Sequence, residues 1–490
     1  MSSTLLSQEK YIHAGKIYDS NSGKYHLNKT IIVSENIISS IEDGFIEPDN
    51  ENVIVYDLKS KVLLPGLIDF HVHMESESGG KDKYINRFQD NKADVAYRST
   101  VVARKTLLAG FTTVRDVGGS GVNISLRNAI NTGVVVGPRI FTSGKTIATT
   151  GGHGDPTNGY REGLVEDPGP EDGVVNSIAD ARKAVRYRYK NGADLIKITA
   201  TGGVMSMAKN GQNPQFTEEV MRAIVNTAND YGMHVAAHAH GDEGMYRAVR
   251  SGVKTIEHGS IMKERTMKLM REKNTYLVPT ISAGEHVAKM AGIPGYYPAI
   301  IIPKALEVGV QNKASTKKAY QMGVPIAFGT DAGVFPHGDN AGEFVYWDEI
   351  GIPPEYSIKS ATITNAKLLN MNNLLGQIKK GFNADIIATN DSPTEDISTL
   401  LNITDGFLAD VLQLTVFCTF NSRYDQIDRA LTRKGRILAK YEFKDLVAEK
   451  AAAIVGEKLH EEDFGKAMTI AEAFNYESPS YNMEELKIGF

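Results

Sequence analysis

The sequence has a single cysteine, Cys418, in 490 residues, so an intramolecular disulfide framework is excluded. It also lacks any uninterrupted apolar span long enough to cross a bilayer. The first ten residues, Met1 to Lys10, contain neither a basic segment nor an apolar core, so they do not resemble a secretory signal peptide. These absences predict a cytoplasmic protein with no membrane partner.

Charge of one sign is not concentrated anywhere in the chain. The formal net charge is only -5, and no long basic run occurs, which argues against nucleic acid as a partner. Apolar residues make up 41% of the chain and charged residues 23%, values that are ordinary for a globular protein. A chain of 490 residues can hold a large barrel and an attached domain.

The most informative stretch runs from Leu63 to His73, an almost continuous apolar segment that ends in His-X-His. Such a run is typical of a strand in a buried parallel sheet. Side chains alternate along a strand, so His71 and His73 point to the same side, at the carboxyl end where barrel enzymes build their sites. Two imidazoles on a rigid element form half of a metal site. The alternative is a pair of ordinary histidines in a loop.

From residue 63 onward, short apolar runs alternate with segments of helical character. We count eight runs, at residues 63–73, 112–117, 139–143, 195–200, 234–238, 255–258, 276–280 and 326–331. Several predicted helices, such as 99–109, 178–191, 218–231 and 241–251, are followed by or border a glycine suited to a helix C-cap. Eight strand–helix units predict an α/β fold of the (β/α)8 TIM-barrel type. A doubly wound open sheet is the alternative, but it would not gather residues from eight strand ends.

Both ends of the chain contain β-like segments, which predict a small β-sandwich domain built from the two ends together. We therefore divide the chain into residues 1–62 and 373–442 as the two parts of this domain, 63–372 as the barrel, and 443–490 as a tail. The tail begins with apolar residues at helical spacing, typical of an amphipathic helix.

The predicted strands end in residues whose side chains can bind a metal ion, either directly or, for lysine, after modification. These residues are His71, His73, Lys197, His238, His258 and Asp331. Histidine and aspartate are zinc ligands. A lysine inside a buried apolar strand is disfavoured as an ammonium, and its neutral amine can react with carbon dioxide to give an anionic carbamate. The alternative for Lys197 is an ion pair with a neighbouring carboxylate.

Several stretches resemble the amidohydrolase superfamily, and within it the imidazolonepropionase-like branch that includes Xaa-Pro dipeptidases and ochratoxinase-type enzymes. The resemblance extends from residue 8 to about 395. It is carried by residues 64–73, 110–118, 150–155, 196–206, 237–241, 256–259, 329–331 and 381–386.

The resemblance implies two divalent metal ions, most simply Zn²⁺, held by the strand-end residues. The more deeply buried ion would be bound by His71, His73 and Asp331, and the second ion by His238 and His258. Carboxylated Lys197 and a hydroxide would bridge the two ions. The family cleaves amide bonds, and Asp331 would be the catalytic residue that moves the proton from the nucleophile to the leaving nitrogen.

Two further histidines, His153 and His240, are expected near the mouth of the barrel. We interpret them as substrate-binding residues that contact a carboxylate, with support of the metal ligands as the alternative. The predicted substrate is a small carboxylate-bearing amide, such as an Xaa-Pro or other dipeptide, an N-acyl amino acid or an ochratoxin-type amide. Residues 160–161, 201–206 and 282–312 are candidate pocket walls, the last as a lid.

Other functions are compatible with parts of the pattern. A deaminase or an imidazolonepropionase-like cyclic amide hydrolase would use one metal, and Lys197 argues against both. A lactonase or phosphotriesterase would use the same two metals on other bonds. A non-catalytic scaffold would have lost its ligands, which are all present here. Resemblance to oligomeric relatives implies a homo-oligomer.

Overall fold

The computed structural model describes residues 9–50, 53–77, 82–207, 210–308 and 311–405. The predicted tail helix, Cys418 and residues 406–442 of the predicted β-sandwich domain lie outside these ranges. No helix within the described ranges is long and apolar enough to span a membrane.

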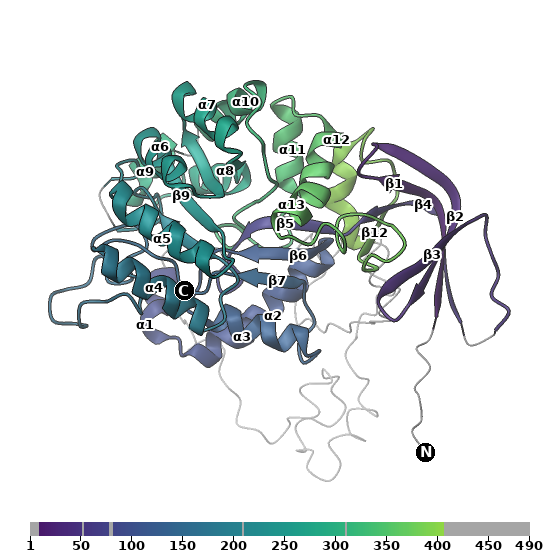
Figure 1. Cartoon of the computed structure of the whole chain (residues 1–490), viewed down its shortest axis with the longest axis horizontal. Coiled ribbons are helices and arrows are strands. Elements are labelled where there is room, and N and C mark those ends of the chain that lie inside the picture. The colour runs from purple at the N-terminus through teal and green to yellow at the C-terminus, as the bar shows by residue number, and fades with distance from the viewer. Residues whose placement is uncertain (1–8, 51–52, 78–81, 208–209, 309–310, 406–490) are drawn as a thin grey trace, which may run out of the picture. The chain divides into compact units, whose positions relative to one another are not determined.

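Two parallel sheets form the centre of the described chain (Figure 1). The first contains β5 (Leu67–Val72), β6 (Phe111–Asp116) and β7 (Arg139–Thr142), in that order. The second contains β8 (Ile196–Thr199), β9 (Val235–Gly241), β10 (Thr255–Ile261) and β11 (Tyr276–Val278). These seven strands correspond to seven of the eight predicted runs, so the predicted α/β class is confirmed.

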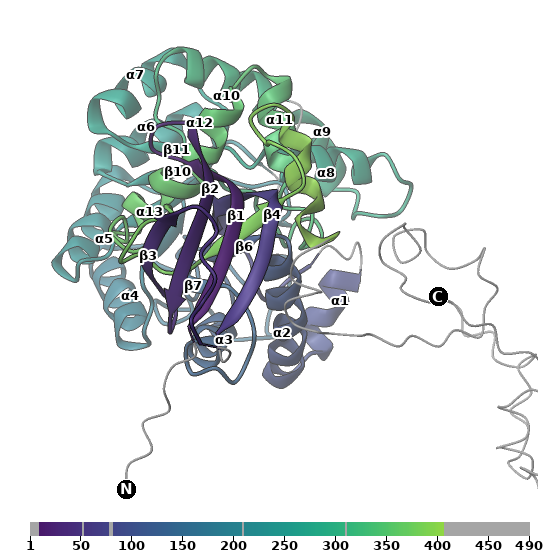
Figure 2. The same ribbon diagram turned by 90° about the vertical axis from the view of Figure 1, so that its right-hand side faces the viewer.

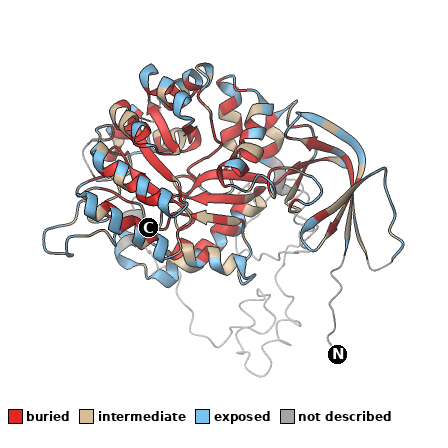
Figure 3. Ribbon diagram, in the orientation of Figure 1, coloured by how far each residue is buried: buried red, intermediate tan, exposed pale blue. Residues whose placement is uncertain are grey.

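Helices separate the parallel strands and expose one side to solvent, while the strands are buried (Figure 3). They are α1 (Asp82–Gln89), α2 (Lys92–Leu108), α3 (Val122–Asn131), α4 (Ile178–Lys190), α5 (Glu218–Asp230), α6 (Asp242–Ser251), α7 (Glu264–Lys273), α8 (Ile281–Ala291), α9 (Ile301–Val308) and α10 (Asn312–Gln321). The hydroxyl of Thr217 caps α5 by accepting from the backbone N–H of Val220. Gly252 ends α6 with φ 95°, as the C-cap pattern predicts.

The last part of the barrel region is helical and returns to the first strand. It contains α11 (Gly342–Glu349), α12 (Pro354–Lys359), a π-helical turn (Ser360–Thr364) and α13 (Asn365–Leu368). The side chain of Asn365 donates to the carbonyls of Ile68 and Phe328, 2.8 and 2.9 Å away.

The eighth predicted strand, 326–331, forms single bridges and not a ladder. Parallel bridges join Ile326 to Leu277 and Ala332 to Val72. A third parallel bridge joins Ile147 to Ile198, between the first parallel sheet and the second. The described residues thus contain two parallel sheets with isolated bridges between them.

A five-stranded sheet in the order β12-β4-β1-β2-β3 lies beside the parallel strands (Figure 2). Its strands are β1 (Lys10–Asp19), β2 (Lys24–Ser34), β3 (Ile37–Asp43), β4 (Ile54–Pro65) and β12 (Ile386–Thr389). Strand β12 follows the barrel region and pairs antiparallel with β4. Both sides of the barrel segment therefore supply strands, as predicted. A second layer that would make the sheet a sandwich is not found among the described residues, which end in a 3-10 helix (Ile397–Asp405).

The long apolar run from Leu63 to His73 is divided between two sheets. Its first three residues belong to β4, and the first barrel strand begins only at Leu67. Gly66 separates the strands, and a Cβ at this position would lie 2.1 Å from Thr112 Oγ1. The chain therefore passes between sheets where no side chain fits.

Candidate metal centre

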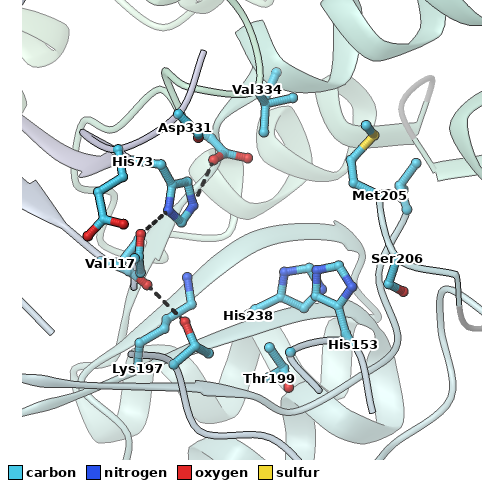
Figure 4. A pocket seen from close by; sticks show the side chains of 18 of the residues that line it. His73, Val117, His153, Lys197, Thr199, Met205, Ser206, His238, Asp331 and Val334 are labelled. Atoms are coloured by element: carbon cyan, nitrogen blue, oxygen red, sulfur yellow. Dashed lines mark hydrogen bonds and ion pairs between the residues drawn. The ribbon is translucent and has the colours of Figure 1, made fainter. Parts of the chain in front are cut away.

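All eight predicted site residues line one cavity of about 1130 Å³. Figure 4 labels His73, His153, Lys197, His238 and Asp331 among them. Four strands supply most of the eight: β5 carries His71, β8 carries Lys197, β9 carries His238 and His240, and β10 carries His258. The others, His73, His153 and Asp331, lie in segments that follow strands. Parallel strands end on one side of a sheet, and this is why residues up to 260 positions apart meet here.

His71, His73 and Asp331 form the first group of possible metal ligands. Asp331 Oδ1 lies 3.5 Å from His71 Nε2 and 3.3 Å from His73 Nε2. This oxygen is buried and has no hydrogen-bond partner among the described residues. The Nδ1 atoms of the two histidines donate elsewhere, to Glu257 Oε2 and to the Gly118 carbonyl, both at 2.8 Å. Both Nε2 lone pairs are therefore directed toward the carboxylate, an arrangement suited to a shared cation.

His238, His240 and His258 form the second group, with one nitrogen of each within 4.8 Å of the others. His238 Nε2 donates to the Gly202 carbonyl at 3.0 Å, which leaves the Nδ1 lone pair free to bind a metal. His258 Nδ1 is hydrogen-bonded to Thr280 Oγ1 at 2.8 Å. The sequence prediction assigned His240 to substrate, and the structure brings it within the second group of possible ligands.

The two groups share Lys197 as a neighbour. Its side chain is buried, and this burial, the largest cause, lowers the pKa of its ammonium to about 8. The charge of Lys197 acts on the pKa of His71, His73 and Asp331 in one group, and of His238 and His258 in the other. An amine with a lowered pKa is partly neutral near pH 8, as carbamate formation requires.

Burial keeps most of the site's imidazoles neutral. It is the largest cause that lowers the pKa of His71 and His240 to about 4 and the pKa of His153 to about 3. Burial lowers the pKa of His73, but the negative charge of Asp331, whose Oδ1 lies 3.3 Å from His73 Nε2, outweighs this effect, so the pKa of His73 is raised. Neutral imidazoles and a carboxylate are the donors that divalent zinc takes, so the residues fit the metal ions that the sequence predicts.

Two ligand positions have a strained backbone. The φ angles of His258 and Asp331 are 72° and 62°, in the left-handed region that residues other than glycine rarely adopt. Thr280, which bonds to His258, has φ 54°. Such strain persists where surrounding contacts fix it, and it is common at functional sites.

The sequence did not reveal how His71 is held. Glu257, next to His258 in β10, accepts from His71 Nδ1 and from Arg115 Nη2, at 2.8 and 2.7 Å. The side chains of Arg115 and Glu257 are both 0% exposed. The sequence shows only that Arg115 and Glu257 are charged residues within apolar strands. Their pairing across 142 positions becomes apparent only in the folded structure.

Asp69 is a second supporting carboxylate that the sequence did not reveal. Its Oδ1 accepts from the backbone N–H of His71 and of Thr330, each at 3.1 Å, and its Oδ2 accepts from the Thr330 hydroxyl at 2.6 Å. The side-chain amide of Asn340 donates to the same Oδ2 at 2.8 Å. Asp69 thus links β5 to the segment that carries Asp331.

His153 lies against the second group of histidines. Its ring stacks on His238 with centroids 4.4 Å apart, and its buried Nδ1 has no hydrogen-bond partner among the described residues. A Cβ on Gly203 would come within 2.3 Å of the His153 ring, so only glycine allows this packing. His153 is thereby directed into the cavity, as predicted.

The predicted walls are present in part. Tyr160 and residues 204–206 line the cavity. The segment 282–312 also lines the cavity, through residues of α8 and α9 such as Val287 and Ala305. It is not an open lid, because most of it forms α8, α9 and the start of α10, and Tyr297 is buried in an apolar cluster there. Apolar residues at helical spacing account for the difference, because their burial favours helices packed against the rest of the chain.

Comparisons with known proteins show the family to which the chain belongs. The amidohydrolase family model matches residues 62–424. Ochratoxinase of Aspergillus niger is 33% identical over 425 residues, covering 81% of this chain and 84% of the relative. A crystal structure of a Xaa-Pro dipeptidase with bound methionine in the active site is similar, with 51% identity, a TM-score of 0.78, and coverage of 80% of this chain and 97% of that one.

A third relative is the crystal structure of a prolidase complexed with N-methylphosphonate-L-proline. It is 32% identical, with a TM-score of 0.73, and the match covers 81% of this chain and 96% of the other. The chain therefore belongs to the amidohydrolase family and is a hydrolase that acts on amide or peptide bonds.

Proposed function

We propose that this protein is a metal-dependent amidohydrolase with two divalent ions, most simply Zn²⁺. One ion would be held by His71, His73 and Asp331, and the other by His238 and His258. The single observation that carries the proposal is the position of buried Lys197 next to both groups. As a carbamate, Lys197 would supply the anionic bridge between the two ions.

Bound in this site, the ions would make water nucleophilic near neutral pH and polarise the carbonyl of the scissile amide. The chain's own contribution centres on Asp331. Its carboxylate is buried beside His71 and His73 and would take the proton of the attacking water. The same carboxyl group would then donate this proton to the leaving nitrogen. His71 and His73 stay oriented by the acceptors of their Nδ1 protons.

We further propose that the substrate is a small amide with a free carboxylate, and an Xaa-Pro dipeptide in the first instance. Similarity to a Xaa-Pro dipeptidase at 51% identity and to a prolidase bound to a proline phosphonate supports this class. His153 and His240 line the cavity beside His238 and are suited to contact the carboxylate. An ochratoxin-type amide is the second candidate, because ochratoxinase is 33% identical.

We also propose that the parallel strands form one closed eight-stranded barrel. The bridges of Ile326 and Ala332 to β11 and β5, and of Ile147 to β8, support closure through the eighth segment. Backbone bonds from Phe70 N to Phe328 O at 2.9 Å and from Asp331 N to His71 O at 2.7 Å support it as well. A closed barrel would explain why ligands from both sheets share a cavity.

The test is a hydrolysis panel with the zinc-loaded full chain. The substrates are Xaa-Pro dipeptides, other dipeptides, N-acyl amino acids, ochratoxin-type amides, lactones and a phosphotriester. We expect the highest kcat/KM with Xaa-Pro dipeptides. Asp331→Asn, the matched control for background hydrolysis, should abolish turnover. Turnover of lactones or phosphotriesters alone would keep the metal site and reject the amide substrate.

A further inference from the structure

Charged and polar side chains line much of the cavity, among them Glu75, Arg98, Lys145 and Asp155, but one part of the lining is apolar. The strand ends carry imidazoles, Lys197 and Asp331, whereas α8 and α9 contribute only small apolar residues and glycine. The residues from these two helices are Ala283, Gly284, Val287, Ala305 and Val308. Figure 4 shows Met205 and Val334 across the cavity from Lys197. We call the surface formed by Met205, Val287, Ala305, Val308 and Val334 the apolar wall.

Four of the five residues of the apolar wall belong to a separate hydrophobic cluster or pack against it. Val287 and Ala305 are buried members of this cluster, and Met205 and Val334 pack against it while remaining partly exposed to the cavity. A partly buried methionine beside aliphatic side chains adapts to apolar groups of different shape. Contact with an apolar ligand would remove the remaining exposed area from water.

The apolar wall adjoins the possible metal ligands. The backbone N–H of Val334 donates to the carbonyl of Asp331 at 3.1 Å. Thr280, whose hydroxyl bonds to His258, directly precedes α8, the helix that carries Val287. A substrate whose amide is held at the ligand groups can therefore place a neighbouring side chain on this wall.

A buried lysine fixes the shape of the apolar wall. Lys304 in α9 donates from Nζ to the carbonyls of Gly203 and Ser206, at 3.2 and 2.6 Å. These two residues flank Met205 in the chain, so its loop is fastened to the helix that carries Ala305. The wall is thus built into the protein before any substrate binds.

We propose that the apolar wall is a subsite for a large aliphatic or thioether side chain, and that it selects leucine and methionine at the first position of Xaa-Pro substrates. This inference rests on the proposed function, in which the proline carboxylate is bound by His153 and His240. Acidic and basic side chains would be excluded, because the wall offers no group to pair with their charge.

The test compares Leu-Pro, Met-Pro, Gly-Pro, Asp-Pro and Lys-Pro with the zinc-loaded full chain. We expect kcat/KM for Leu-Pro and Met-Pro to exceed that for Gly-Pro by about tenfold or more. Asp-Pro and Lys-Pro should be poorer than Gly-Pro. Met205→Asp should lower kcat/KM for Leu-Pro about tenfold and affect Gly-Pro much less. Equal kcat/KM for Leu-Pro and Asp-Pro in the wild type would overturn the inference.

The matched control is Leu306→Asp, which places the same charge on α9 at a position that is 51% exposed and outside the cavity. It should leave both substrates unaffected. Val334→Asp repeats the test from the opposite side of the wall if Met205→Asp folds poorly.

A binding measurement separates this inference from the proposed function. Calorimetric titration with L-leucine, L-methionine, glycine and L-aspartate reports on the subsite without turnover. We expect leucine and methionine to bind about tenfold more tightly than glycine or aspartate, and Met205→Asp to remove that difference. If no amide is hydrolysed but this preference is found, the proposed function fails and the subsite stands. Equal binding of leucine and aspartate rejects the subsite.

Discussion

His71 Nδ1 donates a 2.8 Å hydrogen bond to Glu257 Oε2, and both side chains are almost completely withdrawn from solvent. The bond fixes the tautomer of His71 and directs its Nε2 lone pair toward Asp331. A residue that binds no metal itself therefore determines whether one of the proposed ligands is ready to bind.

Glu257→Gln should weaken zinc binding by about 10- to 100-fold, since the amide can no longer provide a charged acceptor for His71. Zinc affinity is measured by competition with a chelator. Glu264→Gln, which removes an exposed carboxylate paired with Lys318, is the control and should bind zinc normally. Unchanged zinc affinity in Glu257→Gln would mean that His71 is oriented by other contacts.

Arg115→Met should lower the free energy of unfolding by about 3–5 kcal/mol, because it leaves the buried Glu257 carboxylate without its cationic partner. Arg139→Met breaks a partly exposed ion pair with Asp385 and should cost about 0–1 kcal/mol. Urea unfolding of the metal-free proteins compares the two. A similar loss of unfolding free energy in both variants would show that burial of the Arg115–Glu257 pair does not decide its effect on stability.

The residues of the candidate site could be predicted from the sequence, but the contacts that hold them in place could not. Strand ends converge in a parallel α/β fold, so placing His71, His238 and His258 at strand ends was enough to predict that they meet. Arg115 and Glu257 carry no comparable signal, because a charged residue in an apolar strand does not reveal which distant residue neutralises it.

The ends of the strands and helices were harder to predict than the presence of the parallel strands themselves. The run 63–73 reads as one strand, yet the chain leaves one sheet and enters another at Gly66. Only the position of Thr112 explains this break. The segment 282–312 was interpreted as a lid, because its glycines and prolines hide the helical spacing of α8 and α9. The three predicted domain boundaries, at residues 62/63, 372/373 and 442/443, stay predictions.

His240 distinguishes two interpretations of the second group. If it binds the substrate carboxylate, His240→Ala should raise KM for carboxylate-bearing amides more than for neutral amides and keep the zinc content. His238→Ala, by comparison, should lose zinc. Loss of zinc from His240→Ala to the same extent would assign His240 to the metal, as its proximity to His238 and His258 also permits.

We expect buried His234 to lower the free energy of unfolding of the metal-free protein as the pH falls below 6.5. Burial, followed by the charge of Arg115, lowers the pKa of His234 from 6.5 to about 3. Between these pH values the unfolded chain binds more protons than the folded one. The stabilisation is therefore complete above pH 6.5 and is lost as the pH falls toward 3, by at most about 1.4 kcal/mol per pH unit.

Urea unfolding at pH 7.5, 6.5 and 5.5 checks this dependence. His234→Gln should reduce the loss of stability below pH 6.5. His26→Gln, an exposed position in β2, is the control and should follow the wild type. Parallel curves for His234→Gln and the wild type would show that His234 does not contribute.

The central claim is that Lys197 joins two metal ions in one site. The most direct measurement is the zinc content of the full chain and of Lys197→Ala after reconstitution with excess zinc and removal of the free metal. We predict two zinc ions per wild-type chain, fewer in Lys197→Ala, and partial recovery of zinc and activity with a short carboxylic acid. One zinc or none in the wild type, or two in Lys197→Ala, would contradict the claim.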